Sequence, residues 1–123
     1  RRICTTIDLG ESWKEHPTSR RALVEPTCMA SLHRHEYMEE GKKKSMLLFV
    51  NPNNYGTRDN LTLKVSFDDG MTWPEEHWIL FDQYRSAGYS CITSIDENSI
   101  GILYESSQSD LAFIKINLIE ILK

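Results

Sequence analysis

The chain of 123 residues has no hydrophobic run long enough to cross a membrane, because a spanning helix needs about 20 consecutive apolar residues. It also has no excess of basic charge, since 14 Lys and Arg stand against 18 Asp and Glu for a net charge of −4. That balance gives no electrostatic basis for binding nucleic acid. The chain has neither an initiator methionine nor a signal peptide, and we expect it to be an internal piece of a longer protein.

Cysteine is scarce, and Cys4, Cys28 and Cys91 make no disulfide framework. Each lies in a run that reads as strand, so we expect small buried apolar side chains. A metal site is not expected either. His33 and His35 share one face of a predicted strand, but zinc needs three or four converging ligands and His16 lies elsewhere. No motif in the chain requires a cofactor.

No helical periodicity appears before the last six residues, which read as a helical turn or a final edge strand. Apolar and β-branched runs of strand length alternate with turn clusters along the rest of the chain. A short strand near Trp13 is also expected, and residues 38–44 read as a connection with a solvated basic tip. The main predicted strands are residues 3–7, 28–33, 45–50, 61–67, 77–81, 90–95, 99–104 and 111–116.

One motif occurs twice, at residues 6–13 and 66–73, with the pattern hydroxyl, any, Asp, any, Gly, any, hydroxyl, Trp. Its Asp is placed to accept hydrogen bonds from the backbone of a tight turn, and its Gly supplies a left-handed conformation. Its Trp is expected to anchor the turn by burying apolar surface. Turn chemistry accounts for every residue type, so we expect structural rather than catalytic roles for Asp8, Gly10, Trp13, Asp68, Gly70 and Trp73.

A repeat of this size with flanking strands indicates stacked sheet units. If the strands form antiparallel meanders of four, residues 28–81 make one full blade and residues 90–116 make three strands of the next. The first motif then belongs to half of a preceding blade. The expected fold class is therefore all-β, a partial β-propeller of about two blades, since the chain is too short to close a ring of four to eight blades.

The meander also predicts which connections share a face. In antiparallel strands the connections alternate between the two ends of the sheet. Residues 51–60, residues 83–89 and Glu105 are expected at one end. Both copies of the repeated motif and the hairpin at residues 33–44 are expected at the other end.

The sequence resembles the C-terminal part of the catalytic domain of a bacterial exo-sialidase, of the retaining six-bladed propeller family with Asp-box repeats. Residues 1–13, 25–31, 49–73 and 87–106 carry the resemblance. It implies that Tyr89 is the catalytic nucleophile and that Arg58 binds the carboxylate of the sialic acid. It further implies that Glu105 orients another arginine of the same site. That arginine, a third arginine, the acid/base Asp and the Glu partner of Tyr89 have no counterpart in this chain.

The resemblance implies sialylated glycans as substrates and a parent protein that is periplasmic or secreted. The isolated segment is expected to be inactive and to self-associate through exposed blade edges. Two other functions stay open. A non-catalytic Asp-box propeller that binds glycans or proteins would leave Arg58 and Tyr89 apart. Transfer of sialic acid to a sugar acceptor would use every residue visible here.

Overall fold

The computed structural model describes all residues, Arg1–Lys123, and is built almost entirely of strands. No helix in it is both long and apolar enough to cross a membrane. A 3-10 turn spans Glu75–His77 and a one-turn helix, α1, spans Leu118–Ile121. The strands are β1 (Cys4–Thr5), β2 (Lys14–Glu15), β3 (Ser31–Glu39), β4 (Lys42–Pro52), β5 (Leu61–Ser66), β6 (Ile79–Asp82), β7 (Ser90–Asp96), β8 (Ser99–Glu105) and β9 (Leu111–Asn117).

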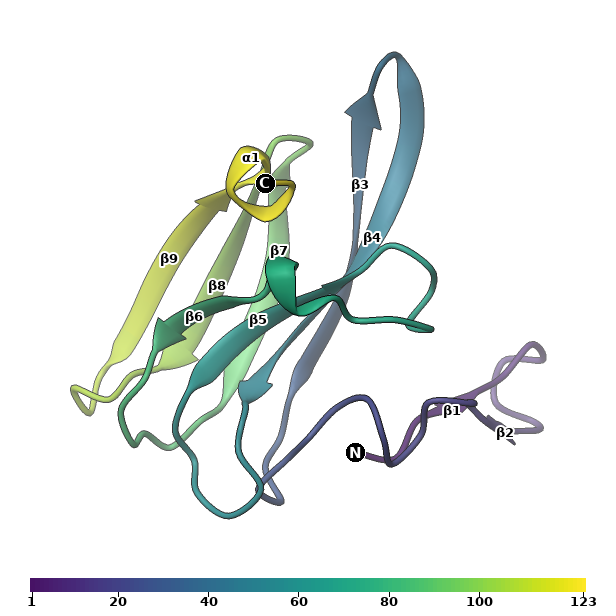
Figure 1. The fold of residues 1–123 in the computed structure, drawn as a ribbon. Helices are drawn as coiled ribbons and strands as arrows, with labels where there is room; N and C mark the ends of the chain where they lie inside the picture. Colours follow the sequence, from purple (N-terminus) through teal and green to yellow (C-terminus); the bar gives the residue numbers. More distant parts are fainter.

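The strands form three antiparallel sheets in which each strand pairs with its neighbour in sequence. The sheets are β1-β2, β3-β4-β5-β6 and β7-β8-β9. Figure 1 shows the second and third sheets stacked against each other, with the small β1-β2 ribbon standing apart beside the N-terminus. The β3-β4 hairpin projects beyond the end of the stack.

The core lies between the two larger sheets. Leu61, Leu63 and Val65 alternate along β5 and are completely buried, as period-two patterning requires of one face of a strand. They pack in one cluster with Ile100 and Ile102 of the other sheet. Burying side chains of this size contributes about 1.5–3 kcal/mol each relative to exposing them. The contact between the sheets therefore holds the two larger sheets in a fixed relative position.

The predicted bounds of β3 were wrong at both ends. Residues 28–30 are not in a strand, and β3 continues to Glu39, so most of the expected connection at residues 38–44 is paired backbone. The pairing is continuous from Ser31 opposite Val50 to Glu39 opposite Lys42. The turn itself is only Glu40 and Gly41, both with positive φ, as tight hairpins favour.

The charged tip continues as strand because its side chains alternate between two environments. Tyr37 and Met46 face the core, while the charged residues beside them face solvent. Lys43 forms an ion pair of 2.7 Å with Glu36 across the hairpin. The charged residues at 38–44 predicted a connection, but their alternation is that of a strand pair.

The three cysteines are free, and only Cys28 is buried. The expectation of three buried side chains was wrong for Cys91, which is exposed, and for Cys4, which is half-buried. Cys91 alternates with Ser90 and Ile92 along β7 and lies on the face turned away from the core. The chain ends as a helical turn, because Asn117 and Glu120 form a capping box that starts α1.

Both copies of the repeated motif form the same hydrogen-bonded turn. Asp8 accepts bonds from the Ser12 amide (2.9 Å) and hydroxyl (2.5 Å), and these lower the pKa of Asp8 to about 2. Asp68 accepts the matching pair from Thr72 at 2.8 and 2.7 Å. Burial raises the pKa of Asp68, but the Thr72 bonds outweigh it and the net shift is downward. Gly10 and Gly70 have φ of 99° and 84°.

The two tryptophans of the motif differ, and the expectation that both are buried was wrong for Trp13. Trp73 packs edge-on against Phe49, with 6.0 Å between ring centroids. Trp13 remains 61% exposed, and its Nε1 donates to the Gly10 carbonyl at 3.0 Å. The difference follows from the sheets: Trp73 has the full β3-β6 sheet behind it, whereas Trp13 borders only the two-stranded ribbon.

Lys64 is a cation buried in the middle of β5 with no carboxylate partner. Its exposure is 0%, its Nζ donates to Asn53 Oδ1 at 2.7 Å, and the Trp78 ring centroid lies 4.4 Å from Nζ. Burial lowers the pKa of Lys64 to about 8. The ammonium ties the strand to the start of the β4-β5 connection, which Asn53 begins.

The titration of Lys64 predicts a pH dependence of stability. The unfolded chain holds this proton up to the ordinary pKa of 10.5, whereas the folded chain releases it near pH 8. Between these values the unfolded state binds more protons, so the free energy of unfolding rises with pH. Urea unfolding should show that the free energy of unfolding rises less between pH 7.5 and pH 10 in Lys64→Met than in the wild type. Lys43→Met, at an exposed position, is the control. An equal rise of the unfolding free energy in Lys64→Met and in the wild type would contradict the lowered pKa of Lys64.

Candidate functional site

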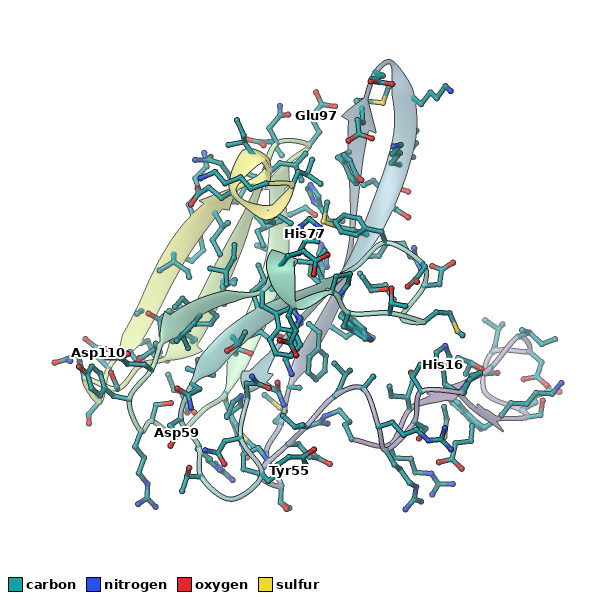
Figure 2. All side chains as sticks on the ribbon, in the orientation of Figure 1. His16, Tyr55, Asp59, His77, Glu97 and Asp110 are labelled. Atoms are coloured by element: carbon teal, nitrogen blue, oxygen red, sulfur yellow. The ribbon has the colours of Figure 1, made fainter.

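Three segments meet at the end of the stack opposite the β3-β4 turn. They are the β4-β5 connection, the β6-β7 connection and the end of β8. Figure 2 shows Tyr55, Asp59 and Asp110 at this end, with Glu97 of the β7-β8 turn at the other. The first two segments are joined by backbone hydrogen bonds from Ser86 N to Arg58 O (2.9 Å) and from Asn60 N to Gln83 O (3.4 Å).

The β4-β5 connection is a compact loop that places Arg58. Its ends are closed by a bond from Asn53 N to Asn60 O at 3.0 Å. Inside it, Asp59 accepts from Asn54 (2.8 Å) and Thr57 (2.7 Å), and these side-chain bonds lower the pKa of Asp59. A loop held by such internal bonds presents Arg58 from a defined backbone.

Arg58 and Tyr89 are brought together. The Arg58 guanidinium carbon lies 5.5 Å from the centroid of the Tyr89 ring, within the range of a cation–π contact. Arg58 Nη1 also donates to the Ala87 carbonyl at 2.9 Å. The other guanidinium N–H groups and the Tyr89 hydroxyl make no hydrogen bond within the chain. Tyr89 is 42% exposed. The free N–H groups of Arg58 and the hydroxyl-bearing ring of Tyr89 therefore lie side by side.

Glu105 lies directly beside Tyr89. Its Oε2 accepts from the Tyr89 backbone N–H at 3.0 Å, and its own N–H donates to the Tyr89 carbonyl at 3.0 Å. Its Oε1 has no partner within the chain, so it remains able to accept from a further donor. A cleft of about 470 Å³ opens next to Glu105 and includes Arg85 and Asp110 in its wall.

Three linked residues behind Gly88, namely Cys28, Arg1 and Glu25, were not assigned to the site from the sequence. The Cys28 thiol lies behind Gly88, 3.7 Å from the Gly88 carbonyl oxygen. Burial raises the pKa of Cys28, an effect that the nearby Arg58 and Arg1 oppose. Arg1 pairs with Glu25 at 2.8 Å and also donates to the Cys28 carbonyl. The only signal in the sequence was that Glu25 stands shortly before the strand predicted at residues 28–33.

The other candidates lie elsewhere. Asp8 lies in the β1-β2 connection of the separate two-stranded sheet. Asp68 lies in the β5-β6 connection, at the opposite end of its sheet from the β4-β5 and β6-β7 connections. His33 Nε2 and His35 Nδ1 each lie 2.8 Å from the Ser94 hydroxyl, and His16 lies beside Thr18. No group of three or more His, Cys, Asp and Glu side chains is arranged to hold a metal ion.

Comparison with known proteins identifies close relatives, although no family model matches the chain. A sialidase of Bacteroides fragilis (strain YCH46) is 45% identical over all 123 residues, which are 23% of its length. A sialidase of Micromonospora viridifaciens is 32% identical over 107 residues, 85% of this chain and 16% of the relative. The solved Hadza microbial sialidase Hz136 superimposes with a TM-score of 0.87 at 44% identity, over 96% of this chain and 23% of that one.

The chain thus spans less than a quarter of the length of the sialidases it matches. The antiparallel sheets and the match to a solved sialidase confirm the predicted fold class, part of a β-propeller. The 45% identity to a sialidase over all 123 residues of this chain confirms the resemblance inferred from the sequence. The chain belongs to the bacterial sialidase family, as a segment of the longer proteins of that family.

Proposed function

We propose that this segment supplies three active-site residues of an exo-sialidase that removes terminal α-linked sialic acid from glycans with retention of configuration. One observation carries the proposal: the guanidinium of Arg58 lies 5.5 Å from the ring of Tyr89, whose amide is bound by Glu105. These residues come from the β4-β5 connection, the β6-β7 connection and the last position of β8. The relatives of the chain are named sialidases, which supports this choice of reaction.

Arg58 is suited to bind the substrate carboxylate. A guanidinium is planar, always charged and able to donate two parallel hydrogen bonds to a carboxylate. Only Nη1 is engaged, with the Ala87 carbonyl, and that bond fixes the direction of the side chain. Contact with the Tyr89 ring restrains the group further. In the proposed site Arg58 holds sialic acid with its anomeric carbon next to Tyr89.

Tyr89 is proposed as the nucleophile. The anomeric carbon of sialic acid bears a carboxylate, which would repel an anionic Asp or Glu nucleophile, whereas a neutral phenol approaches without that penalty. In the first step the Tyr89 oxygen bonds to the anomeric carbon, the bond to the leaving oxygen breaks, and a general acid protonates that oxygen. Water then attacks the same carbon and the phenol leaves. The acid and the base for the phenol come from parts of the enzyme outside this segment.

Glu105 is proposed to orient an arginine supplied by another blade. Its Oε2 is occupied by the Tyr89 amide, and its free Oε1 faces no donor of this chain. A guanidinium bound there would sit close to the start of β7 and add to the charge that binds the carboxylate. The same geometry serves transfer to water or to a sugar acceptor. Since such glycans lie outside the cytoplasm, we propose a periplasmic or secreted parent protein.

The non-catalytic propeller is the second candidate. It predicts that Arg58 and Tyr89 point in different directions, and their proximity favours the enzyme instead. The observation that favours a binding role is the exposed Tyr55, which Figure 2 shows at this end of the stack, together with the exposed Tyr84 of the β6-β7 connection.

Replacing Tyr89 tests the nucleophile in the full-length sialidase. We expect Tyr89→Phe to lower kcat for a fluorogenic sialoside about 100-fold or more, because no covalent intermediate can form. The folded structure should be unchanged, since the hydroxyl makes no hydrogen bond within this segment. Mass spectrometry after reaction with a fluorinated sialosyl donor should find the adduct on Tyr89 in the wild type and none in the variant. Tyr84→Phe, at an exposed tyrosine of the same β6-β7 connection, is the control. Unchanged turnover by Tyr89→Phe would refute this function.

The isolated segment provides a second test. Residues 1–123 should not hydrolyse a fluorogenic sialoside, because the acid, the base and two arginines are supplied elsewhere. The outward face of β7-β9 exposes Leu103, Leu111 and Phe113, so we also expect concentration-dependent association in analytical ultracentrifugation. Turnover by a purified monomeric segment would show that its own residues suffice. Such a result would contradict the proposed division of the site between blades.

A further inference from the structure

Gly88, the residue before Tyr89, is in an unusually crowded position. It is buried and has a φ of +90°. A Cβ placed on it would lie 3.0 Å from Pro52 Cγ, 3.2 Å from Cys28 Sγ and 3.5 Å from Arg58 Cβ. The first two distances are tighter than nine in ten real Cβ contacts. The backbone conformation favours glycine, and any side chain here would also press on Pro52 and Cys28.

The backbone around Gly88 is held from two sides. On one side Arg58 takes the Ser86 N–H at its carbonyl (2.9 Å) and donates its Nη1 to the Ala87 carbonyl (2.9 Å). On the other side the buried Cys28 thiol faces the carbonyls of Ala87 and Gly88 at 4.0 and 3.7 Å. Residues 86–88 thus lie between the β4-β5 connection, which carries Arg58, and the segment that precedes β3.

The Cys28 side of this contact is itself anchored. Arg1 donates to the Cys28 carbonyl and forms an ion pair with Glu25 at 2.8 Å. The Arg1 guanidinium also lies 5.9 Å from the Phe49 ring centroid, on β4. Cys28 is outside any strand, so these contacts rather than a sheet ladder fix the position of its thiol.

We propose that Cys28, Pro52 and Gly88 form a clamp that sets the position of Tyr89 relative to Arg58. Pro52 ends β4, Cys28 precedes β3, and Gly88 precedes β7. The clamp therefore ties the β3-β6 sheet to the start of the β7-β9 sheet. Its members are positioning residues, since none needs to touch substrate. The inference rests on the proposed role of Tyr89 as nucleophile. Misplacing a reacting group by about 1 Å can lower the rate about 100-fold, so a small displacement is sufficient.

The clamp predicts a selective loss of kcat. A Cβ at position 88 meets Arg58 Cβ at an ordinary van der Waals distance but is too close to Pro52 and Cys28. The strain therefore moves the Gly88 backbone and the attached Tyr89, while Arg58 keeps its place. In the full-length sialidase we expect Gly88→Ala to lower kcat for a fluorogenic sialoside about 100-fold with KM changed less than about threefold.

Gly41→Ala is the matched control. Gly41 also has a positive φ, +73°, but it sits at the β3-β4 turn, and no atom lies within 4 Å of the place that an alanine Cβ would take there. Both substitutions impose a left-handed conformation on alanine, and only that at position 88 adds crowding. Gly41→Ala should keep wild-type kcat and KM. A loss of kcat at nearly unchanged KM, in a protein as stable as the Gly41→Ala control, separates displacement of Tyr89 from a general structural defect, which would lower the amount of folded enzyme instead.

The outcomes separate the clamp from the proposed function. Folded Gly88→Ala with wild-type kcat overturns the clamp. If Gly88→Ala does not accumulate as folded protein, Cys28→Val alone decides: a kcat loss of about tenfold with unchanged KM supports the clamp, and wild-type kcat overturns it. Turnover retained by Tyr89→Phe would instead refute the function, whatever the clamp variants show.

Discussion

The packing of the β3-β6 sheet on the β7-β9 sheet is the contact on which the rest of this structure depends. Leu61, Leu63 and Val65 of β5 meet Ile100 and Ile102 of β8 with almost no exposed surface. Polar contacts at the edge of this core set the start of β7. The Ser90 hydroxyl lies 3.0 Å from the Ser31 hydroxyl and 3.4 Å from the Val50 carbonyl. Since Tyr89 directly precedes Ser90, the position of the proposed nucleophile follows from the packing of these two sheets.

Antiparallel pairing separates stability from chemistry in this chain. Every strand pairs with its sequence neighbour, so successive connections alternate between the two ends of the stack. The polar groups at the first end are satisfied locally. Asp68 is hydrogen-bonded to Thr72, and Lys43 near the β3-β4 turn is paired with Glu36. The connections at the other end carry Arg58 and Tyr89, and the Arg58 Nη2 and the Tyr89 hydroxyl make no hydrogen bond within the chain. Loops at one end can therefore vary while turns at the other end preserve the sheets.

Some features were predictable because they depend on local patterns. Alternating apolar residues located β5, β7, β8 and β9 to within a residue or two, and the Asp-x-Gly pattern located both turns. Other features depend on neighbours that a local pattern does not reveal. The extension of β3 to Glu39 needs its partner strand, and the exposure of Trp13 reflects the small ribbon beside it. Cys28 looked like a strand residue because its chemistry suits a strand, yet contacts with Arg1 and Gly88 determine its place.

By itself the sequence determined the all-β class, the repeated turns, the family, and which end of the sheets carries Arg58, Tyr89 and Glu105. Alternation and connectivity suffice for the class and the placement, since these follow from the chain order of strands, and the motifs suffice for the family. Only the tertiary structure decided that Arg58 contacts the Tyr89 ring, that Glu105 binds the Tyr89 amide, and that Cys28 packs behind Gly88. These contacts join residues 16 to 60 positions apart, and their distances depend on how two sheets pack rather than on any local propensity.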